Sequence, residues 1–363
     1  MGSKTSCVST AKHDKLLQTG IHPTERGIKM VNRRASSVVF GFDFQVNAAI
    51  ILMLENISDL KSLRLEGDNE DIDLTLNNNQ HILAQAKAVV NSSSDFRNVR
   101  RNLKNALVSL SEACQKVDTK QLIFITNSPN PFNDDGSRSV FWQPTHRTFE
   151  TLPPSAQAIV TDYLKSIPTP LNLDKFTVQV FPFETDDDSE RYKAVMKTID
   201  DFIGDLDINI PGLGKRLLEI WHWDIFTNGS KANAVIQLDK KNIIWPIMVI
   251  ATDIAKCDDD FLNEFDPAVY EEIVHHYKNT IDNCCERIEF FTRVLSDFSG
   301  FHSSKRPSKR MIDFVEQNWK NYYEEFSVPG MDEETQEGLT KIVLYNIVRR
   351  RFTIDKIKRG VNL

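Results

Sequence analysis

Two alternating segments on either side of an asparagine run constrain the fold of this chain more than any other feature. Polar residues recur at every second position before and after Asn77–Asn79. The polar positions are Asp71, Asp73, Thr75, His81, Gln85 and Lys87, and they are interleaved with Ile72, Leu74, Leu76, Ile82, Ala84, Ala86 and Ala88. Period-two alternation on both sides of a turn predicts a β-hairpin.

The position of the turn also predicts the register of this hairpin. If the turn is centred on Asn78, Asp71 lies directly opposite Gln85, and Lys87 lies opposite Asn69. Directly opposed side chains have Cβ atoms about 4.5–5.5 Å apart. A divalent cation could therefore bridge Asp71 and Gln85. A half-buried hairpin with an ordinary solvated face would show the same alternation, so the pattern alone leaves both interpretations open.

Length and composition indicate a soluble protein of two domains. The chain has 363 residues, of which 26% are charged and 40% hydrophobic, and its net charge is −7. The longest apolar run, residues 243–251, is far shorter than the roughly 20 residues that span a bilayer. Five cysteines without a CxxC pair are typical of the reducing cytosol. We expect a cytoplasmic protein with no membrane contact.

Two doublets, His275-His276 and Cys284-Cys285, raise the question of a zinc site. They fall in a segment with helical periodicity, where adjacent side chains point about 100° apart. One residue of each doublet at most could face a common ion. We therefore expect a helix surface there and no zinc.

The chain divides by pattern into three parts. Residues 1–34 carry seven Lys or Arg against two acids and predict a flexible basic arm. Residues 35–207 predict an α+β domain with a mixed sheet. Its elements are a helix opening at 41–45 with Gln45 in its first turn, strands near 63–66 and in the hairpin, a helix over 97–117, strands over 121–126 and 176–181, and a helix over 189–203. Residues 208–363 predict an all-α domain that binds partners, including helices over 266–300 and from Asp332.

The predicted order helix, strand, strand, strand, helix, strand resembles the αβββαβ core of the PD-(D/E)xK nuclease superfamily, a restriction-endonuclease-like fold. Asp71 matches the acid of its second strand, and Gln85-Ala86-Lys87 matches the tripeptide of its third strand in a glutamine variant. The likeness is closer to the double-strand DNA endonuclease effectors of bacterial anti-phage systems. The matching stretches are Gly41-Phe42-Asp43-Phe44-Gln45, Glu66 with Glu70-Asp71-Ile72, Gln85-Ala86-Lys87 and Thr126-Asn127, and they cover about a quarter of the chain.

The C-terminal half resembles the tail of nuclease subunits from three-component, Lamassu-type defence systems. The resemblance lies in Leu217-x-x-x-Trp221-x-Trp223 followed by long helices with basic ends. It implies that an SMC-like ATPase and a small third subunit hold the chain until foreign DNA is sensed, and that the active form is a homo-oligomer.

The resemblance also implies roles for individual residues. Asp71 would be the main ligand of Mg²⁺, with Mn²⁺ as an alternative ion, and Gln85 and the Ala86 carbonyl would be further ligands. Lys87 would orient the attacking water or hold a phosphate oxygen, and Glu66 and Gln45 would support the site or add a ligand. Because Gln85 replaces an acid, metal affinity should be weak. That fits an enzyme kept inactive until assembly, and it also fits a decayed site.

A basic cluster follows the hairpin in the sequence. Arg97, Arg100, Arg101 and Lys104 would contact the DNA backbone, although a solvated helix face explains them equally well. The sequence contains no P-loop, GxSxG, HExxH or dinucleotide fingerprint. The expected function is therefore a metal-dependent DNA endonuclease, and the alternative is a catalytically silent DNA-binding or scaffold subunit.

Overall fold

The computed structural model describes residues 36–252, 261, 265–273, 287–303, 307–327 and 329–363. Ser36–Leu363 forms one compact unit. The predicted arm at residues 1–34 and the His275-His276 and Cys284-Cys285 doublets lie outside the described residues.

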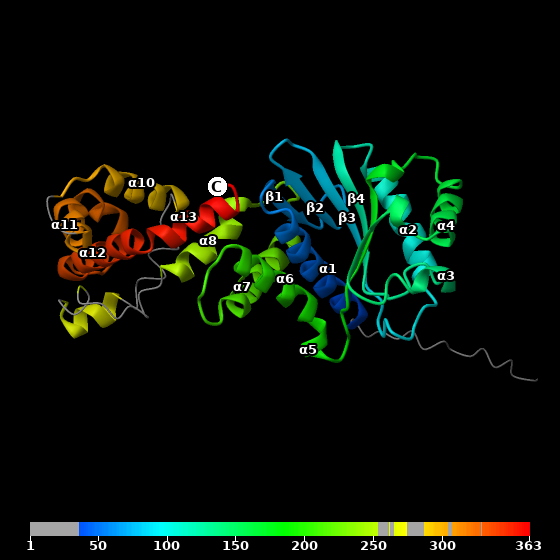
Figure 1. Cartoon of the computed structure of the whole chain (residues 1–363), viewed down its shortest axis with the longest axis horizontal. Coiled ribbons are helices and arrows are strands. Elements are labelled where there is room, and N and C mark those ends of the chain that lie inside the picture. Colours follow the sequence, from blue (N-terminus) through cyan, green and yellow to red (C-terminus); the bar gives the residue numbers. More distant parts are fainter. Residues whose placement is uncertain (1–35, 253–260, 262–264, 274–286, 304–306, 328) are drawn as a thin grey trace, which may run out of the picture. The chain divides into compact units, whose positions relative to one another are not determined.

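A mixed seven-stranded sheet has the strand order β5-β6-β4-β3-β2-β1-β7. The strands are β1 (Leu60–Leu65), β2 (Ile72–Leu76), β3 (His81–Lys87), β4 (Thr119–Thr126), β5 (Thr145–Thr148), β6 (Phe176–Val180) and β7 (Leu238–Asp239). β3, β4 and β6 run parallel, whereas the pairs β1–β2, β2–β3, β5–β6 and β1–β7 are antiparallel. The sheet is therefore an antiparallel meander joined to a parallel half (Figure 1).

The hairpin register is confirmed between β2 and β3. Ile72 pairs with Ala84 and Thr75 pairs with His81, as a turn centred on Asn78 requires. Asn79 adopts φ 63° in this turn, a left-handed conformation that asparagine tolerates better than most residues.

The expected pairing of Lys87 with Asn69 is wrong, because the chain leaves the ladder at Asp71. The Glu66 amide donates to the Asp71 carbonyl over 2.8 Å, and Glu66 itself has φ 52°. This turn directs Asn69 to Asp73, whose Oδ2 accepts from Asn69 Nδ2 over 2.7 Å.

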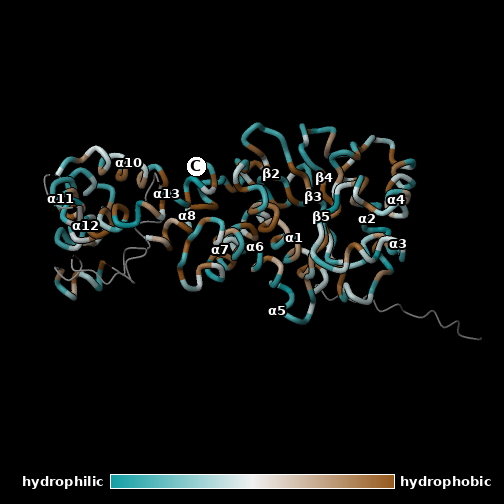
Figure 2. The backbone as a smooth tube through the Cα atoms, in the orientation of Figure 1, coloured by the Kyte–Doolittle hydropathy of each residue, from teal (hydrophilic) through white to brown (hydrophobic). Residues whose placement is uncertain are grey.

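Hydrophobic cores cover both faces of the sheet. On β4, Ile123 and Ile125 join the core that contains α1, whereas Leu122 and Phe124 join the core that contains α2. The first core contains α1 (Ser36–Glu55), α6 (Lys193–Asp205) and α7 (Leu213–Gly229), and the second contains α2 (Val99–Ala113) and α4 (Pro154–Leu164). Hydrophobic stretches of the chain fall largely within these helices and strands (Figure 2).

The observed order α1, β1, β2, β3, α2, β4 matches the predicted order, with two shifts of helix ends. α1 begins at Ser36, so Gln45 lies in the middle of the helix and not in its first turn. Gly41 does not start the helix, since an interior glycine costs only about 1 kcal/mol. α2 is shorter than the predicted 97–117, and Arg97 lies in the loop before it.

The C-terminal region is helical, as predicted, and also contributes β7 to the sheet. Its helices include α8 (Lys240–Ala251), α10 (Arg287–Gly300), α11 (Pro307–Asn318), α12 (Glu333–Arg349) and α13 (Arg351–Gly360). Asp332 caps α12 by accepting from the Thr335 amide over 2.8 Å, and α10 ends at Gly300. Residues 274–286 of the predicted 266–300 helix lie outside the described residues. α7 packs on α1 and β1, across the predicted boundary at 207/208.

Among the described residues, α1 is the one helix long and apolar enough to cross a membrane by length and composition. Most of its apolar window, 61%, is buried inside the protein. That burial is typical of the core helix of a folded domain, and it agrees with the place of α1 against the sheet.

Candidate active site

Three residues at the end of β3 converge on the Asp71 carboxylate. Asp71 Oδ2 accepts hydrogen bonds from Gln85 Nε2 and from the Ala86 amide, the latter over 3.0 Å. Lys87 Nζ lies 3.4 Å from the same oxygen. Asp71 directly precedes β2, whose pairing with β3 ends at Ile72 and Ala84. The Asp71 side chain therefore lies where one more residue of β2 would have paired with β3. The structure thus brings Asp71, Gln85 and Lys87 together, although the Gln85 amide nitrogen and not the predicted amide oxygen faces Asp71.

The backbone of Ala86 faces the same point. Its N–H is directed at Asp71, on the β2 side of β3. In an extended strand the N–H and C=O of one residue point to the same neighbour. The Ala86 carbonyl is thus also directed toward the β2 edge, beyond the last paired residues of β2 and β3, Ile72 and Ala84.

Glu66 and Gln45 complete the predicted set. Desolvation first, and then the Asp71 carboxylate, raise the pKa of Glu66, whereas a hydrogen bond with Gln45 and the charge of Lys87 lower it. These contacts place Glu66, which follows β1, between α1 and the hairpin. All five side chains predicted as catalytic are therefore neighbours, although Gln45 comes from the middle of α1.

Glu70 also belongs to this site, although no catalytic or metal-binding role was predicted for it from the sequence. It is only 5% exposed, and burial raises its pKa to about 7, with a smaller increase from Asp71 and an opposing hydrogen bond from Ser109 of α2. In the described part of the chain, Glu70 Oε1 is buried without a hydrogen-bond partner. Its position next to Asp71 in the sequence could have suggested a role for Glu70. The alternation of polar and apolar residues could not show that the turn buries the Glu70 side chain.

Polar contacts through Asp73 and Lys116 anchor the turn that contains Glu66, Glu70 and Asp71. Asp73, buried on β2, accepts from Asn69 and lies 2.6 Å from His81 Nδ1. Lys116, after α2, donates to the Asp68 carbonyl over 3.1 Å. The turn from Glu66 to Asp71 is thereby held against the sheet face that α2 covers.

Thr126 and Asn127, predicted as polar residues at a strand end, hold the chain just after Lys87. Thr126 Oγ1 donates to the Lys87 carbonyl over 2.7 Å. Asn127 is buried, accepts from the Val89 amide over 2.7 Å and donates to the carbonyls of Val89 and Phe183. They position the backbone of the site.

The predicted DNA-binding residues lie at the start of α2 and in the loop before it. Arg97, Arg101 and Lys104 are exposed. Arg97 forms an ion pair with Asp95 over 2.8 Å, and Arg100 donates to the Asn133 carbonyl over 3.3 Å. Contact with nucleic acid remains a prediction for all four.

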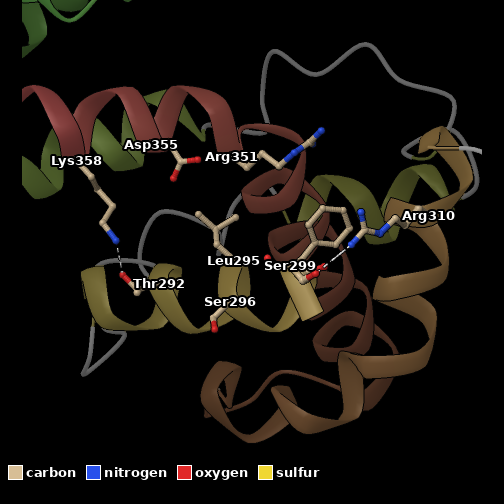
Figure 3. A pocket seen from close by; sticks show the side chains of 9 residues that line it. Thr292, Leu295, Ser296, Ser299, Arg310, Arg351, Asp355 and Lys358 are labelled. Atoms are coloured by element: carbon tan, nitrogen blue, oxygen red, sulfur yellow. Dashed lines mark hydrogen bonds between the residues drawn. The ribbon is translucent and has the colours of Figure 1, made fainter. Parts of the chain in front are cut away.

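A separate groove lies among the C-terminal helices, with a volume of about 490 Å³. Its walls are Thr292, Leu295, Ser296, Phe298 and Ser299 of α10, Arg310 of α11, and Arg351, Asp355 and Lys358 of α13. Figure 3 shows Asp355 and Lys358 projecting toward α10, where Lys358 Nζ donates to Thr292 Oγ1 over 2.9 Å. This groove shares no residue with the predicted site.

No known protein family, curated protein or solved structure matches the chain. Across the described residues, no three His, Cys, Asp or Glu side chains are grouped so as to hold a metal ion. A metal at Asp71 would therefore also need the Gln85 amide and the Ala86 carbonyl, which are the neutral ligands predicted from the sequence.

Proposed function

We propose that this chain is a metal-dependent endonuclease that cleaves phosphodiester bonds of double-stranded DNA. The observation that carries the proposal is the convergence of Gln85, Ala86 and Lys87 on Asp71. This convergence occurs at the end of a hairpin within the element order α1, β1, β2, β3, α2, β4. The same order and the same residue types characterise the nuclease superfamily that the sequence resembles.

The donor set suits Mg²⁺, with Mn²⁺ as an alternative ion. Asp71, Glu66, the Ala86 carbonyl and the Gln85 amide oxygen would hold it, after rotation of the amide that now donates to Asp71. The unpartnered Glu70 Oε1 supports a cation here, because a buried carboxylate oxygen is costly unless it is paired. When bound, the ion neutralises phosphate charge and lowers the pKa of water.

Lys87 has the clearest role among the protein groups. Its ammonium has three N–H donors and is partly exposed, with one donor directed at Asp71. The remaining donors would hold a phosphate oxygen and stabilise the negative charge that develops on it. Lys87 would also orient the attacking water, and Glu66, which is hydrogen-bonded to Gln45, would add its carboxylate to the ligands of the ion.

The resemblance extends the proposal to a cellular role. The chain would be the nuclease effector of a Lamassu-type, cytoplasmic defence complex against phage or plasmid DNA. An SMC-like ATPase and a small third subunit would hold it, and a homo-oligomer would be the active form. The neutral Gln85 supports this regulation, since one missing negative charge weakens metal binding and leaves the free chain poorly active.

A second candidate function is a catalytically silent DNA-binding or scaffold subunit. It is favoured by one observation, that the described residues contain no grouping of three His, Cys, Asp or Glu side chains suited to a metal ion. In that case the Asp71 network would only brace the hairpin.

Plasmid cleavage by the chain assembled with its ATPase and third subunit separates the two functions. We expect Mg²⁺-dependent nicking that EDTA abolishes and that Asp71→Ala and Lys87→Ala each lower by about 100-fold or more. Asp355→Ala, in the distant groove, is the matched control and should cleave normally.

A metal titration followed by thermal denaturation gives a second readout that does not require activity. Mg²⁺ at ten times its Kd should stabilise the wild-type chain by about 1.4 kcal/mol and leave Asp71→Ala unchanged. Equal cleavage by wild type and Asp71→Ala would refute the nuclease proposal. An absence of cleavage together with an absence of Mg²⁺ stabilisation would favour the scaffold.

A further inference from the structure

An aromatic cluster on α1 and α7 is exposed beside the candidate site. Trp223 is 66% exposed and Phe226 is 40% exposed. Their rings are nearly parallel, with an interplanar angle of 16° and centroids 6.2 Å apart. Phe42 of α1 meets Phe226 edge-on, with centroids 5.3 Å apart. A contiguous cluster of exposed rings, unlike a single exposed side chain, is typical of a binding surface.

The two tryptophans of α7 differ in burial, since one packs in the core and the other is exposed to solvent. Trp221 is 1% exposed, donates its indole N–H to the Ile243 carbonyl over 2.8 Å and packs on Phe202. α7 is therefore anchored to the core through Trp221. Trp223, two residues later, contributes little to that burial, so the fold does not explain its size or its position.

The aromatic cluster adjoins the candidate site through neighbouring residues of α1, α7 and β1. Phe42 lies three residues before Gln45, on the same side of α1. Gly229 at the end of α7 lies close to both Phe42 and Leu65, since a Cβ there would stand 3.1 Å from the Phe42 ring and 2.8 Å from the Leu65 side chain. Leu65 directly precedes Glu66. α1 and α7 are neighbours in the fold (Figure 1).

The charges along α7 nearly cancel. Lys215, Arg216 and Lys231 are exposed at the two ends of α7, and Glu219 and Asp224 lie between them. A ligand of the rings would therefore be held mainly by ring contact and only weakly by charge. Nucleobases bind in this way, because every base has a flat face that stacks on an aromatic side chain.

We propose that Trp223, supported by Phe226 and Phe42, stacks on an unpaired nucleobase next to the phosphate at the candidate site. In a continuous duplex, each base face is already covered by its neighbours. The preferred DNA substrate would then carry unpaired bases near the cut, at a gap, a flap or an end. This inference rests on the proposed nuclease function and narrows its substrate class.

The test measures stacking without cleavage. The full chain in EDTA is titrated into a gapped duplex that carries 2-aminopurine at the unpaired position, and into a continuous duplex of the same length. Stacking on Trp223 should quench the fluorescence of the gapped DNA. Trp223→Ala should abolish the quenching and weaken binding of the gapped DNA by roughly 5- to 150-fold. Binding of the continuous duplex should change less than about twofold.

Matched variants distinguish stacking from loss of bulk. Trp223→Phe should retain most of the quenching because it keeps a ring. Trp142→Ala removes a tryptophan that is 72% exposed elsewhere and should bind like wild type. The effect of Trp223→Ala should persist when salt is raised, since it does not depend on ion pairs.

Several results would overturn the inference. Quenching that Trp223→Ala retains, or an absence of quenching with the wild-type chain, would exclude stacking on this ring. Equal loss of affinity for both DNAs would also refute it. A change in oligomeric mass of Trp223→Ala, with unchanged quenching, would assign the cluster to contact with a second copy. Failure of the nuclease proposal is a separate result, because it is decided by Asp71→Ala in the cleavage assay.

Discussion

The candidate site and the groove between α10 and α13 both gather charged side chains, but their polar atoms are partnered in different ways. At the site, Glu70 is buried with one unpartnered oxygen and a raised pKa. In the groove, Arg310 donates to the carbonyls of Phe298 and Phe301, and Arg351 stacks on Phe298 and Phe352. The groove charges hold helix ends together, whereas burial at the site favours the protonated form of Glu70. Charge clustering alone therefore does not identify a functional site.

The largest predicted effect is on the free energy of unfolding, and it concerns a buried arginine on the strand that precedes Glu66. Arg64 on β1 is 3% exposed and donates to the carbonyls of Asn228, Lys231 and Ile236. Arg64→Ala would leave these carbonyls without their donor, and we expect the free energy of unfolding to fall by about 3–5 kcal/mol. Arg310→Ala should cost only about 1 kcal/mol, because its side chain is only half-buried.

Urea denaturation of both variants measures this difference. Arg64→Lys should recover only part of the loss, since one ammonium cannot replace the forked guanidinium. Equal destabilisation by Arg64→Ala and Arg310→Ala would show that the two regions depend equally on their arginines.

The pH dependence of stability should distinguish the buried acid of the site from the exposed acid of the groove. Burial raises the pKa of Glu70 from about 4.5 to about 7. The folded state therefore favours the protonated form, so this contribution to stability is complete below pH 4.5 and is lost as pH rises through 7. Glu70→Gln mimics the protonated form and should be more stable than wild type at pH 8 by roughly 3 kcal/mol.

At pH 4 the Glu70→Gln variant and the wild type should unfold at the same denaturant concentration. Asp355→Asn, in the groove, should match wild type at both pH values, because Asp355 is exposed. The measurement is urea denaturation in metal-free buffer at pH 4 and pH 8. A Glu70→Gln variant that gains nothing at pH 8 would mean that water or an ion already satisfies the Glu70 carboxylate.

The smallest effect concerns the basic residues of the two regions. If Arg101 and Lys104 contact DNA phosphates, replacing both with Gln should reduce the slope of log K against log salt by about 1.8, because each contact contributes about 0.9. Arg351→Gln with Lys358→Gln should leave the slope unchanged. Fluorescence anisotropy with duplex DNA between 50 and 200 mM salt, roughly the range used to resolve such slopes, provides the measurement. If both double variants gave the same slope, Arg101 and Lys104 would contribute no more to DNA binding than Arg351 and Lys358 do.

The parts of the fold that depend on local pattern could be predicted from the sequence. Alternation around Asn77–Asn79 predicted the hairpin, and its turn predicted the register that pairs Ile72 with Ala84. The helical pattern from Asp332 predicted the start of α12. The start of α1 was predicted too late: the helix begins at Ser36 and continues through Gly41, because a single interior glycine costs only about 1 kcal/mol.

The residues of the candidate site also fall into two groups, those that local pattern could predict and those that it could not. Asp71, Gln85 and Lys87 could be placed together because one turn relates them, and period-two geometry leaves little freedom. Glu70 could not be assigned, because its environment is created by α2 and by the turn held through Asn69 and Asp73. Arg64 was missed for the same reason, since its acceptors are more than 160 residues away in the chain.

Local sequence pattern was enough to predict the central strands, the β2–β3 register and the residue types at the hairpin end, because these depend on neighbours within a few positions. Tertiary packing alone established which of those residues are buried and which of their polar atoms have a hydrogen-bond partner. Burial and unpaired charge arise when α1, α2 and α7 pack on the sheet, and packing joins positions that no local pattern relates. The chemistry of the hairpin was thus readable in advance, whereas its electrostatic environment was not.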